Sequence, residues 1–145
     1  MSIRRRAREI ALHVLYQLDI SQGDPQKTLD LYFNHFKSSE KAREFCERLV
    51  YGVIRYLEQI DGVIEENSEN WTLKRMGVVD RNILRFATFE LLFSPEIPFK
   101  ATLNEAIELA KKFGTEESGA FINGILDKIH LQVSSSPVPP KPVNV

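Results

Sequence analysis

The sequence predicts an all-α fold, with about seven helices arranged in two small helical bundles. Apolar residues recur at helical spacing through most of the chain, whereas the alternation that is typical of strands is almost absent. Turn-forming stretches separate the periodic segments, as in "SQGDP" at residues 21–25 and "SPEIP" at residues 94–98. At 145 residues and 43% hydrophobic composition, the chain is long enough to bury a core within one domain.

The first predicted helix covers residues 3–18, and the second lies around residues 29–36. One face of the first helix is apolar at regular helical intervals, which predicts that this face joins the core. Its apolar residues are Ile3, Ala7, Ile10, Ala11, Val14, Leu15 and Leu18. The apolar residues of the second, shorter helix are Leu29, Tyr32, Phe33 and Phe36.

The longest apolar stripe runs from Ala42 to Ile64 and predicts one continuous helix of about six turns. Cys46 lies within this stripe, so we interpret it as a small buried apolar side chain rather than as a reactive thiol. The pattern breaks at "ENWTLKRMG", residues 69–77. There we expect a loop with one short helix and with Trp71 as its packing anchor.

A further helix begins near Val79, and Glu90 falls near its apolar face. Because a buried carboxylate must be hydrogen-bonded, we interpret Glu90 as a structural link to the backbone of the following loop. Pro95 and Pro98 prevent the helix from continuing through that loop.

Two more helices complete the prediction. Thr102 and Glu105 match a T-x-x-E capping box, which predicts that the next helix opens at Thr102, and Gly114 stands where its end is expected. The last predicted helix runs from about residue 118 to 130. Gly124 in its middle indicates a close crossing with another helix.

We therefore expect a single domain over residues 1–132. An N-terminal bundle at about residues 3–67 and a C-terminal bundle at about residues 71–131 would meet at the "SENW" stretch. Residues 133–145 contain four prolines and three serines, which predicts a disordered tail.

The composition argues against an enzyme, a metalloprotein and a membrane protein. The three histidines are scattered, the single cysteine cannot form an internal disulfide, and no Gly-rich phosphate loop is present. The sequence therefore indicates no catalytic residue, no metal site and no cofactor. Because it contains no convincing secretory signal and no apolar run near the roughly 20 residues of a membrane span, we expect a soluble, cytoplasmic protein.

Positive charge is concentrated at the start of the chain. Arg4, Arg5, Arg6 and Arg8 give residues 1–16 a local charge of +3, although the whole chain has a formal net charge of −1. A protein that coats nucleic acid without selectivity is usually basic overall. This distribution instead predicts one small basic site on a slightly acidic molecule.

Two interpretations of the basic turn stay open from spacing alone. In the functional one, the arginines bind phosphates and Tyr16 offers a base-stacking ring, which together favour single-stranded RNA. In the other, the arginines form an ordinary solvated face with Arg5 paired to Glu9, and Leu12 and Tyr16 pack under a neighbouring helix. Membrane binding is disfavoured because the apolar face of this helix is needed for the core.

Several stretches of the chain resemble the bacterial NusB family of antitermination factors. They are "RRRAREIALHVLYQ", the "YGV…QID" stretch, "WTLKRMGVVDRNILRFATFELLF" and "TLNEAIELAKKFGTEESGAFINGILDKI", and they occur in the family's order over roughly residues 3–130. The resemblance implies an all-α fold of two bundles and no catalysis. It also implies binding to boxA RNA of ribosomal RNA leader transcripts together with NusE, a small-subunit ribosomal protein. The resemblance further implies that the pair helps to hold the elongating RNA polymerase in a termination-resistant state.

The resemblance also implies the functional residues. The RNA-binding positions are Arg4, Arg5, Arg6, Arg8, Tyr16, Glu117 and Phe121, and the NusE-binding positions are Tyr16, Ile20 and Asp80. Arg8→Ala is then expected to weaken RNA binding without unfolding the protein. Ala120 stands where the family often has a lysine, which predicts weaker RNA binding by this protein alone. The family contains homodimers, so a second copy of the chain is another implied partner.

Two other function classes remain as alternatives. The chain could be an RNA-targeting domain like the NusB-like part of some ribosomal RNA methyltransferases, although 145 residues leave no room for a catalytic domain. It could also be a helical protein-interaction module whose arginines have no RNA ligand.

Overall fold

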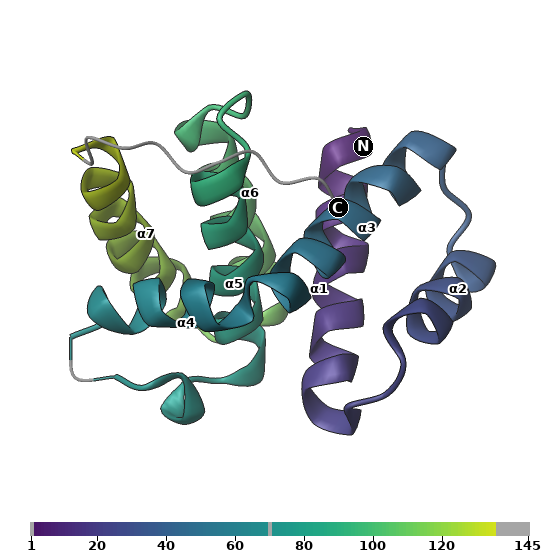
Figure 1. The fold of residues 1–145 in the computed structure, drawn as a ribbon, viewed down its shortest axis with the longest axis horizontal. Coiled ribbons are helices and arrows are strands. Elements are labelled where there is room, and N and C mark those ends of the chain that lie inside the picture. The colour runs from purple at the N-terminus through teal and green to yellow at the C-terminus, as the bar shows by residue number, and fades with distance from the viewer. Residues whose placement is uncertain (1, 70, 136–145) are drawn as a thin grey trace.

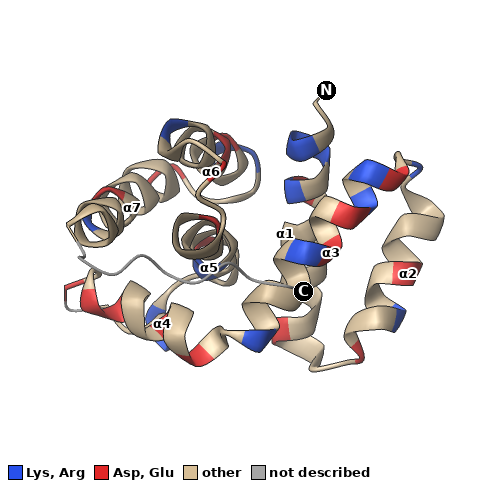
Figure 2. Cartoon of the chain, turned by 45° about the horizontal axis from the view of Figure 1, so that its top comes forward, with Lys and Arg blue, Asp and Glu red and all other residues tan. Residues whose placement is uncertain are grey.

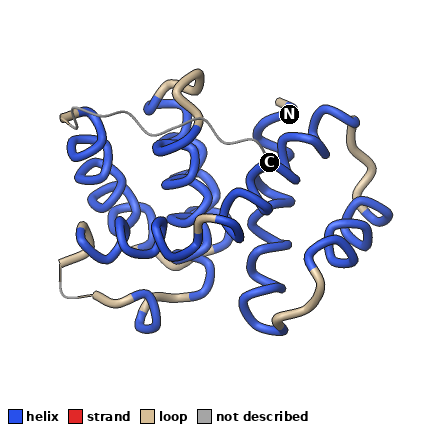
Figure 3. The backbone as a smooth tube through the Cα atoms, in the orientation of Figure 1, coloured by secondary structure: helices blue, strands red, loops and turns tan. Residues whose placement is uncertain are grey.

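A computed structural model describes residues 2–69 and 71–135 of the chain. Within these residues all regular secondary structure is helical and no strand is formed (Figure 3), which confirms the all-α prediction. The elements are α1 (Ile3–Ser21), α2 (Pro25–His35), α3 (Glu40–Arg55), α4 (Leu57–Glu66), the short 3-10 helix η1 (Leu73–Arg75), α5 (Val78–Phe93), α6 (Phe99–Phe113) and α7 (Ser118–Ser134).

The first three helices each begin at a side chain that caps the free backbone N–H groups. The Ser2 hydroxyl accepts a hydrogen bond from the Arg5 amide, and the Ser39 hydroxyl accepts one from the Ala42 amide. Asp24 caps α2 in the same way, and Pro25 follows it at the first helical position. Local sequence therefore fixes where α1, α2 and α3 start.

The third predicted helix is wrong as a single element, because it divides at Tyr56 into α3 and α4. Tyr56 leaves helical geometry at φ −111° and ψ 27°, and its ring packs 4.6 Å from that of Phe93 in α5. Beyond this break the chain changes direction (Figure 1). As a result, α3 packs on α1, whereas α4 packs on α5 and α7.

The capping-box prediction for α6 is also wrong. The helix begins three residues earlier, at Phe99, directly after Pro98. Thr102 is buried inside the first turns of α6, and Glu105 accepts hydrogen bonds from Arg5 of α1 rather than capping its own helix. The predicted end of the helix at Gly114 is confirmed.

One continuous core connects all seven helices. In Figure 1, α1, α2 and α3 lie to one side and α5, α6 and α7 to the other, with α4 running beneath the second group. The long helices α1 and α5 pack against each other at the centre, and Phe86 and Phe89 of α5 are among its largest fully buried side chains. The division into two bundles at residues 68–71 stays a prediction.

The close helix crossing involves Gly52 rather than the predicted Gly124. A β-carbon added at Gly52 would lie 2.1 Å from Cε1 of Phe89, so α3 can approach α5 only because this residue has no side chain. At Gly124 a β-carbon would meet no atom within 4 Å. The interpretation of Gly124 is therefore wrong.

Two further predictions concern Cys46 and the C-terminal end of the chain. Cys46 is fully buried, and burial raises the pKa of its thiol, which confirms its assignment to the core. The last helix continues to Ser134, so Val133 and Ser134 are helical and do not belong to a disordered tail. Residues 136–145, the rest of the predicted tail, lie outside the described residues. None of the helices described has the length and apolar character needed to span a membrane.

Candidate nucleic-acid interface

Three arginines occupy the first turn of α1. Ser2 caps the helix two residues before Arg4. Arg4 and Arg5 are exposed, and Arg6 is partly buried. Figure 2 shows the positive residues as bands at this end of the helix, close to the N-terminus. The prediction of a small local basic site therefore agrees with the position of these three side chains.

Each of the three arginines has a defined neighbour. The guanidinium carbon of Arg4 lies 5.6 Å from the ring centre of Phe45, and that of Arg6 lies 5.5 Å from the ring centre of Phe36. Both distances are typical of cation–π contacts. Arg5 instead forms a bidentate pair with Glu105, with Nε to Oε2 and Nη2 to Oε1 distances of 2.9 Å. The expected Arg5–Glu9 pair is thus replaced by a contact between α1 and α6.

The expectation that Arg8 belongs to the exposed basic face is wrong. Its residue is only 2% exposed, and its guanidinium donates two hydrogen bonds of 2.8 Å to the Glu90 carboxylate. The hydroxyl of Thr102 donates a third, also of 2.8 Å. A buried charge must be paired and hydrogen-bonded, and this arrangement meets both conditions. The interpretation of Glu90 as a link to the following loop is wrong for the same reason.

Leu12 and Tyr16, which the structural interpretation places together under a neighbouring helix, have different environments. Leu12 is 2% exposed and packs in the core, as the structural interpretation expected, whereas Tyr16 is 39% exposed. Ile20, one turn further along, is 58% exposed. The two predicted partner-binding residues of α1 therefore both reach the surface.

The predicted site residues do not gather at one point. Arg4 and Ile20 lie about 24 Å apart along α1, at 1.5 Å per residue. Glu117 and Phe121 stand at the start of α7, where Glu117 is exposed and Phe121 is partly buried. These residues mark an extended surface rather than a pocket.

Helix α6 connects the start of α7 to the middle of α1. Lys112 of α6 pairs with Glu9 of α1 at 2.9 Å, and the ring of Phe113 meets that of His13 edge-on at 4.9 Å. Since Glu117 follows Phe113 by four residues, the corner between α6 and α7 lies beside the centre of α1. The end of α6, which leads into α7, therefore lies beside α1.

His13 lies half-buried where α1, α2 and α6 meet. Its ring stacks 6.1 Å from Tyr32 and 6.5 Å from Phe36, in addition to its contact with Phe113. Burial is the largest cause that lowers the pKa of His13; nearby Lys112 and Arg6 lower it further, against an opposing effect of Glu9. The junction therefore favours a neutral imidazole.

Asp80, the third predicted partner residue, lies half-buried in the first turn of α5. Beside it, Arg81 and Asn82 donate hydrogen bonds of 2.7 and 2.9 Å to Asp19 of α1. Burial alone would raise the pKa of Asp19, but these hydrogen bonds and the charges of Arg81 and Arg85 lower it overall. A polar network thus attaches the start of α5 to the end of α1.

Trp71 is not the packing anchor that the sequence predicts. Its side chain is 46% exposed, and it lies next to a predicted RNA-binding residue, because its ring meets that of Phe121 edge-on at 6.0 Å. The guanidinium carbon of Arg75 lies 5.3 Å from the ring centre of Trp71. Sequence reasoning missed both Trp71 and Arg75 as surface residues.

Phe36 and Phe45 were also missed, and their sequence positions explain why. Both lie at helical spacing that suggests core residues. Only the packing of α1 between them reveals that their rings contact the guanidinium groups of Arg4 and Arg6. The short run "KR" beside Trp71 was the one available signal for a second basic aromatic site.

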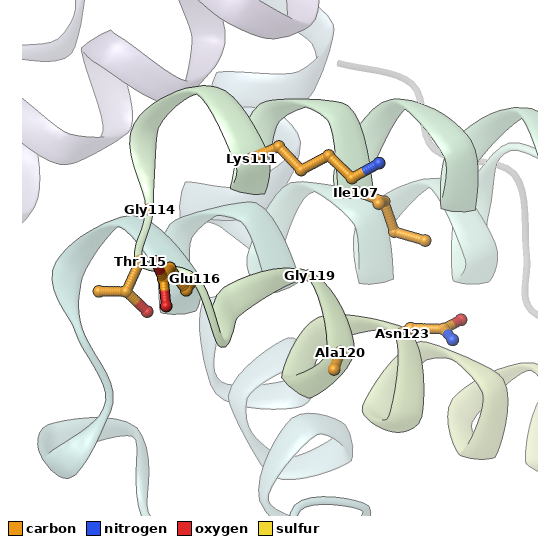
Figure 4. Close-up of a pocket in the computed structure, with 8 residues that line it drawn as sticks. All are labelled: Ile107, Lys111, Gly114, Thr115, Glu116, Gly119, Ala120 and Asn123. Atoms are coloured by element: carbon orange, nitrogen blue, oxygen red, sulfur yellow. The ribbon is translucent and has the colours of Figure 1, made fainter.

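A hollow of about 490 Å³ separates the end of α6 from the start of α7 (Figure 4). Ala120 lies on its wall, and Lys111 extends along α6 on the other side of the hollow. Residue 120, where the resemblance implies a lysine, therefore contributes only a methyl group here. Across the described residues, no group of three or more His, Cys, Asp or Glu side chains is placed to hold a metal ion.

Curated relatives match almost the whole chain. The antitermination protein NusB of Desulfatibacillum aliphaticivorans is 47% identical over 133 residues, covering 92% of this chain and 93% of the relative. NusB of Trichlorobacter lovleyi is 50% identical over 129 residues, covering 89% and 91% of the two chains. Both alignments therefore span nearly the full length of each protein.

Solved structures agree with these relatives. NusB of T. maritima superposes with a TM-score of 0.84 at 42% identity, covering 89% of this chain and 91% of that one. A structure of the antitermination factors NusB and NusE in complex with dsRNA gives a TM-score of 0.82 at 30% identity, covering 91% and 98%. The NusB family model matches residues 5–131. This chain belongs to the NusB family.

Proposed function

We propose that this protein is a transcription antitermination factor that binds RNA together with NusE. Membership of the NusB family supports the proposal, and so do relatives that are named as antitermination proteins. A similar protein has been solved with NusE and dsRNA. For this chain, the proposed ligand is the boxA element of ribosomal RNA leader transcripts, bound so that RNA polymerase continues past termination signals.

The first-turn arginines of α1 carry the proposal. Arg4, Arg5 and Arg6 lie together at one end of a molecule whose formal net charge is −1, and the Arg5 charge is already paired with Glu105. Guanidinium groups bind phosphate oxygens with charge-assisted hydrogen bonds, so this turn suits an RNA backbone. We assign Arg8 a different role from these three, because its ion pair with Glu90 holds α1 in place beneath them.

NusE is assigned to the far end of the same surface. Tyr16 and Ile20 are exposed on α1, and Asp80 lies in the first turn of α5 beside the network that joins the two helices. Glu117 and Phe121 complete the proposed RNA surface on α7. The function needs no catalytic step, and we place it in the cytoplasm because bacterial transcription takes place there.

An RNA titration tests the proposal. A boxA-containing RNA and a scrambled RNA of equal length are titrated with the protein at two salt concentrations, with and without NusE. We expect NusE to tighten binding to boxA more than to the scrambled RNA. The affinity of the protein alone is expected to be low, because Ala120 supplies no cation. Equal binding of both RNAs, unchanged by NusE, would show that the proposed function is wrong.

Two variants connect the titration to individual residues. Arg4→Ala and Arg6→Ala should each weaken RNA binding and reduce its salt slope by about 0.7 for each lost phosphate contact. Lys27→Ala, which removes the same charge from the exposed start of α2, is the matched control and should leave both quantities unchanged. If the control weakens binding as much as the arginine variants do, general charge rather than the first turn of α1 determines affinity.

A further inference from the structure

Trp71 is the single tryptophan of the chain, and much of its surface is exposed to solvent. Tryptophan is highly buried on average because its ring has a large apolar area. Here 46% of the residue faces solvent, although the neighbouring Leu73 is buried in the core. The fold therefore uses Leu73 to anchor this segment and leaves the indole at the surface.

The backbone around Trp71 is held in place from both sides. The Trp71 amide donates to the carbonyl oxygen of Ser68 at 3.2 Å, and the buried Ser68 hydroxyl donates to the carbonyl oxygen of Trp71 at 2.6 Å. Two residues later, the Leu73 amide donates to the carboxylate of Glu65 at 3.1 Å. The indole thus projects from a fixed support.

Two neighbours orient the indole ring. Phe121 of α7 meets it at an interplanar angle of 72°, and the guanidinium carbon of Arg75 lies 5.3 Å from the ring centre. The Arg75 guanidinium lies over the indole, so a base would stack on the part of the ring that Arg75 and Phe121 leave exposed, while a phosphate would meet the cation. Trp71 and Arg75 together thus offer a contact for the base and a contact for the phosphate of one nucleotide.

The surroundings favour a nucleotide over an apolar protein surface. Lys74 and Arg75 supply two adjacent cations in η1, while the nearby acidic Glu69 is neutralised by Lys128 at 2.6 Å. Among the described residues, no other large apolar side chain of the segment from Trp71 to Arg75 is exposed.

We propose that Trp71 and Arg75 form a base-stacking site for single-stranded RNA, which extends the RNA surface from Phe121 onto η1. The inference rests on the proposed function, because the RNA reaches this site after contacting α1 and the start of α7. The proposed site adds a base-stacking contact at a place on the surface that the arginines of α1 do not reach. Stacking on a ring tolerates any base, so this site contributes affinity rather than sequence preference.

The intrinsic fluorescence of Trp71 provides a direct readout. Because the chain has one tryptophan, a boxA-containing single-stranded RNA titrated into the protein alone should quench its emission as the base stacks. Trp71→Ala should weaken binding, followed by the anisotropy of labelled RNA, by about 5- to 150-fold, and Trp71→Phe should recover most of the loss. Arg75→Gln should weaken binding more than the matched variant Lys74→Gln, which removes the same charge next to it.

The outcomes separate this inference from the function on which it rests. If Arg4→Ala weakens RNA binding while Trp71→Ala does not, and the emission of the wild-type protein is unchanged, the stacking site is wrong and the function stands. If Trp71→Ala weakens binding to NusE but not to RNA, the ring belongs to a protein interface and the inference is overturned. If the wild-type protein binds no RNA with or without NusE, both proposals fail. Quenching of the wild-type protein does not depend on how any variant folds.

Discussion

The ion pair between Arg8 and Glu90 is the most deeply buried charged contact described between α1 and α5. Both side chains are almost fully removed from solvent, and Thr102 of α6 adds a hydrogen bond to the same carboxylate. Removing one member of such a pair leaves the other charge buried without compensation. The Arg8–Glu90 pair therefore stabilises the packing of α1 on α5.

Arg8→Ala is expected to destabilise the protein by about 3–5 kcal/mol, measured as the free energy of unfolding in urea. Arg4→Ala, which removes an exposed arginine from the same helix, should change this free energy by no more than about 0.5 kcal/mol. Equal stability of the two variants would show that the Arg8–Glu90 pair does not support the fold.

The role of Arg8 could not be read from the sequence, and the reason is physical. Arg4, Arg5, Arg6 and Arg8 have the same chemistry, and helical spacing places Arg8 at the border of the apolar face. What buries it is a carboxylate that lies 82 positions further along the chain. Local pattern could identify the basic turn, but it could not decide which of its arginines has a partner inside the core.

At the scale of the helix, the crossing of α3 and α5 depends on the absence of a side chain. Gly52 faces the ring of Phe89, which is fully buried and cannot move away without disturbing the core. The "YGV" stretch therefore contains a packing requirement rather than a functional site.

Gly52→Ala should lower the free energy of unfolding by about 1–3 kcal/mol because the new methyl group overlaps Phe89. Gly62→Ala, in the exposed part of α4 where a β-carbon meets no atom within 4 Å, is the matched control. This change should raise stability by about 0.5–1 kcal/mol through helix propensity. Thermal unfolding of both variants measures the two effects, and opposite signs are required.

Most helices were predictable from periodicity, and the errors lie at their ends. The apolar stripe from Ala42 to Ile64 is real, but the period alone could not reveal the helix break at Tyr56, whose ring packs on Phe93 of α5. The T-x-x-E pattern at Thr102 resembled a cap, yet its hydroxyl is used by Glu90. In each case a contact with a distant element outweighed a local signal.

For the molecule as a whole, His13 is expected to make the free energy of unfolding depend on pH. His13 joins α1, α2 and α6, and its folded-state pKa is lowered from its usual 6.5 mainly by burial. Below that value the unfolded chain binds a proton that the folded protein does not accept. The contribution of His13 is therefore present above pH 6.5 and is lost as the pH falls toward the lowered pKa.

We expect the free energy of unfolding to decrease from about pH 7.5 to about pH 5.5, where histidine titrates. In His13→Gln this decrease should be smaller, because no imidazole is left at the junction. His35→Gln removes an exposed histidine from α2 and should retain the slope of the wild-type protein. Urea unfolding at several pH values gives the three slopes, and an unchanged slope in His13→Gln would contradict the assignment.

The basic site was predictable at this scale because charge is a property of the sequence itself. A local charge of +3 on a chain of net charge −1 is enough to predict a basic turn at the start of α1. The cation–π contacts of Phe36 and Phe45 were not predictable, since apolar residues at helical spacing look alike whether they fill the core or contact a cation. Only the packing of α1 against α2 and α3 distinguishes them.

The two cation–π contacts of α1 have a consequence for the thermodynamics of binding. A free arginine loses about 2 kcal/mol of rotamer entropy when a ligand fixes it. Arg4 and Arg6 are already restrained against Phe45 and Phe36, so much of this cost is met during folding rather than on contact with RNA. The entropic cost of fixing these two arginines on binding an anionic ligand is therefore lower than for free arginines.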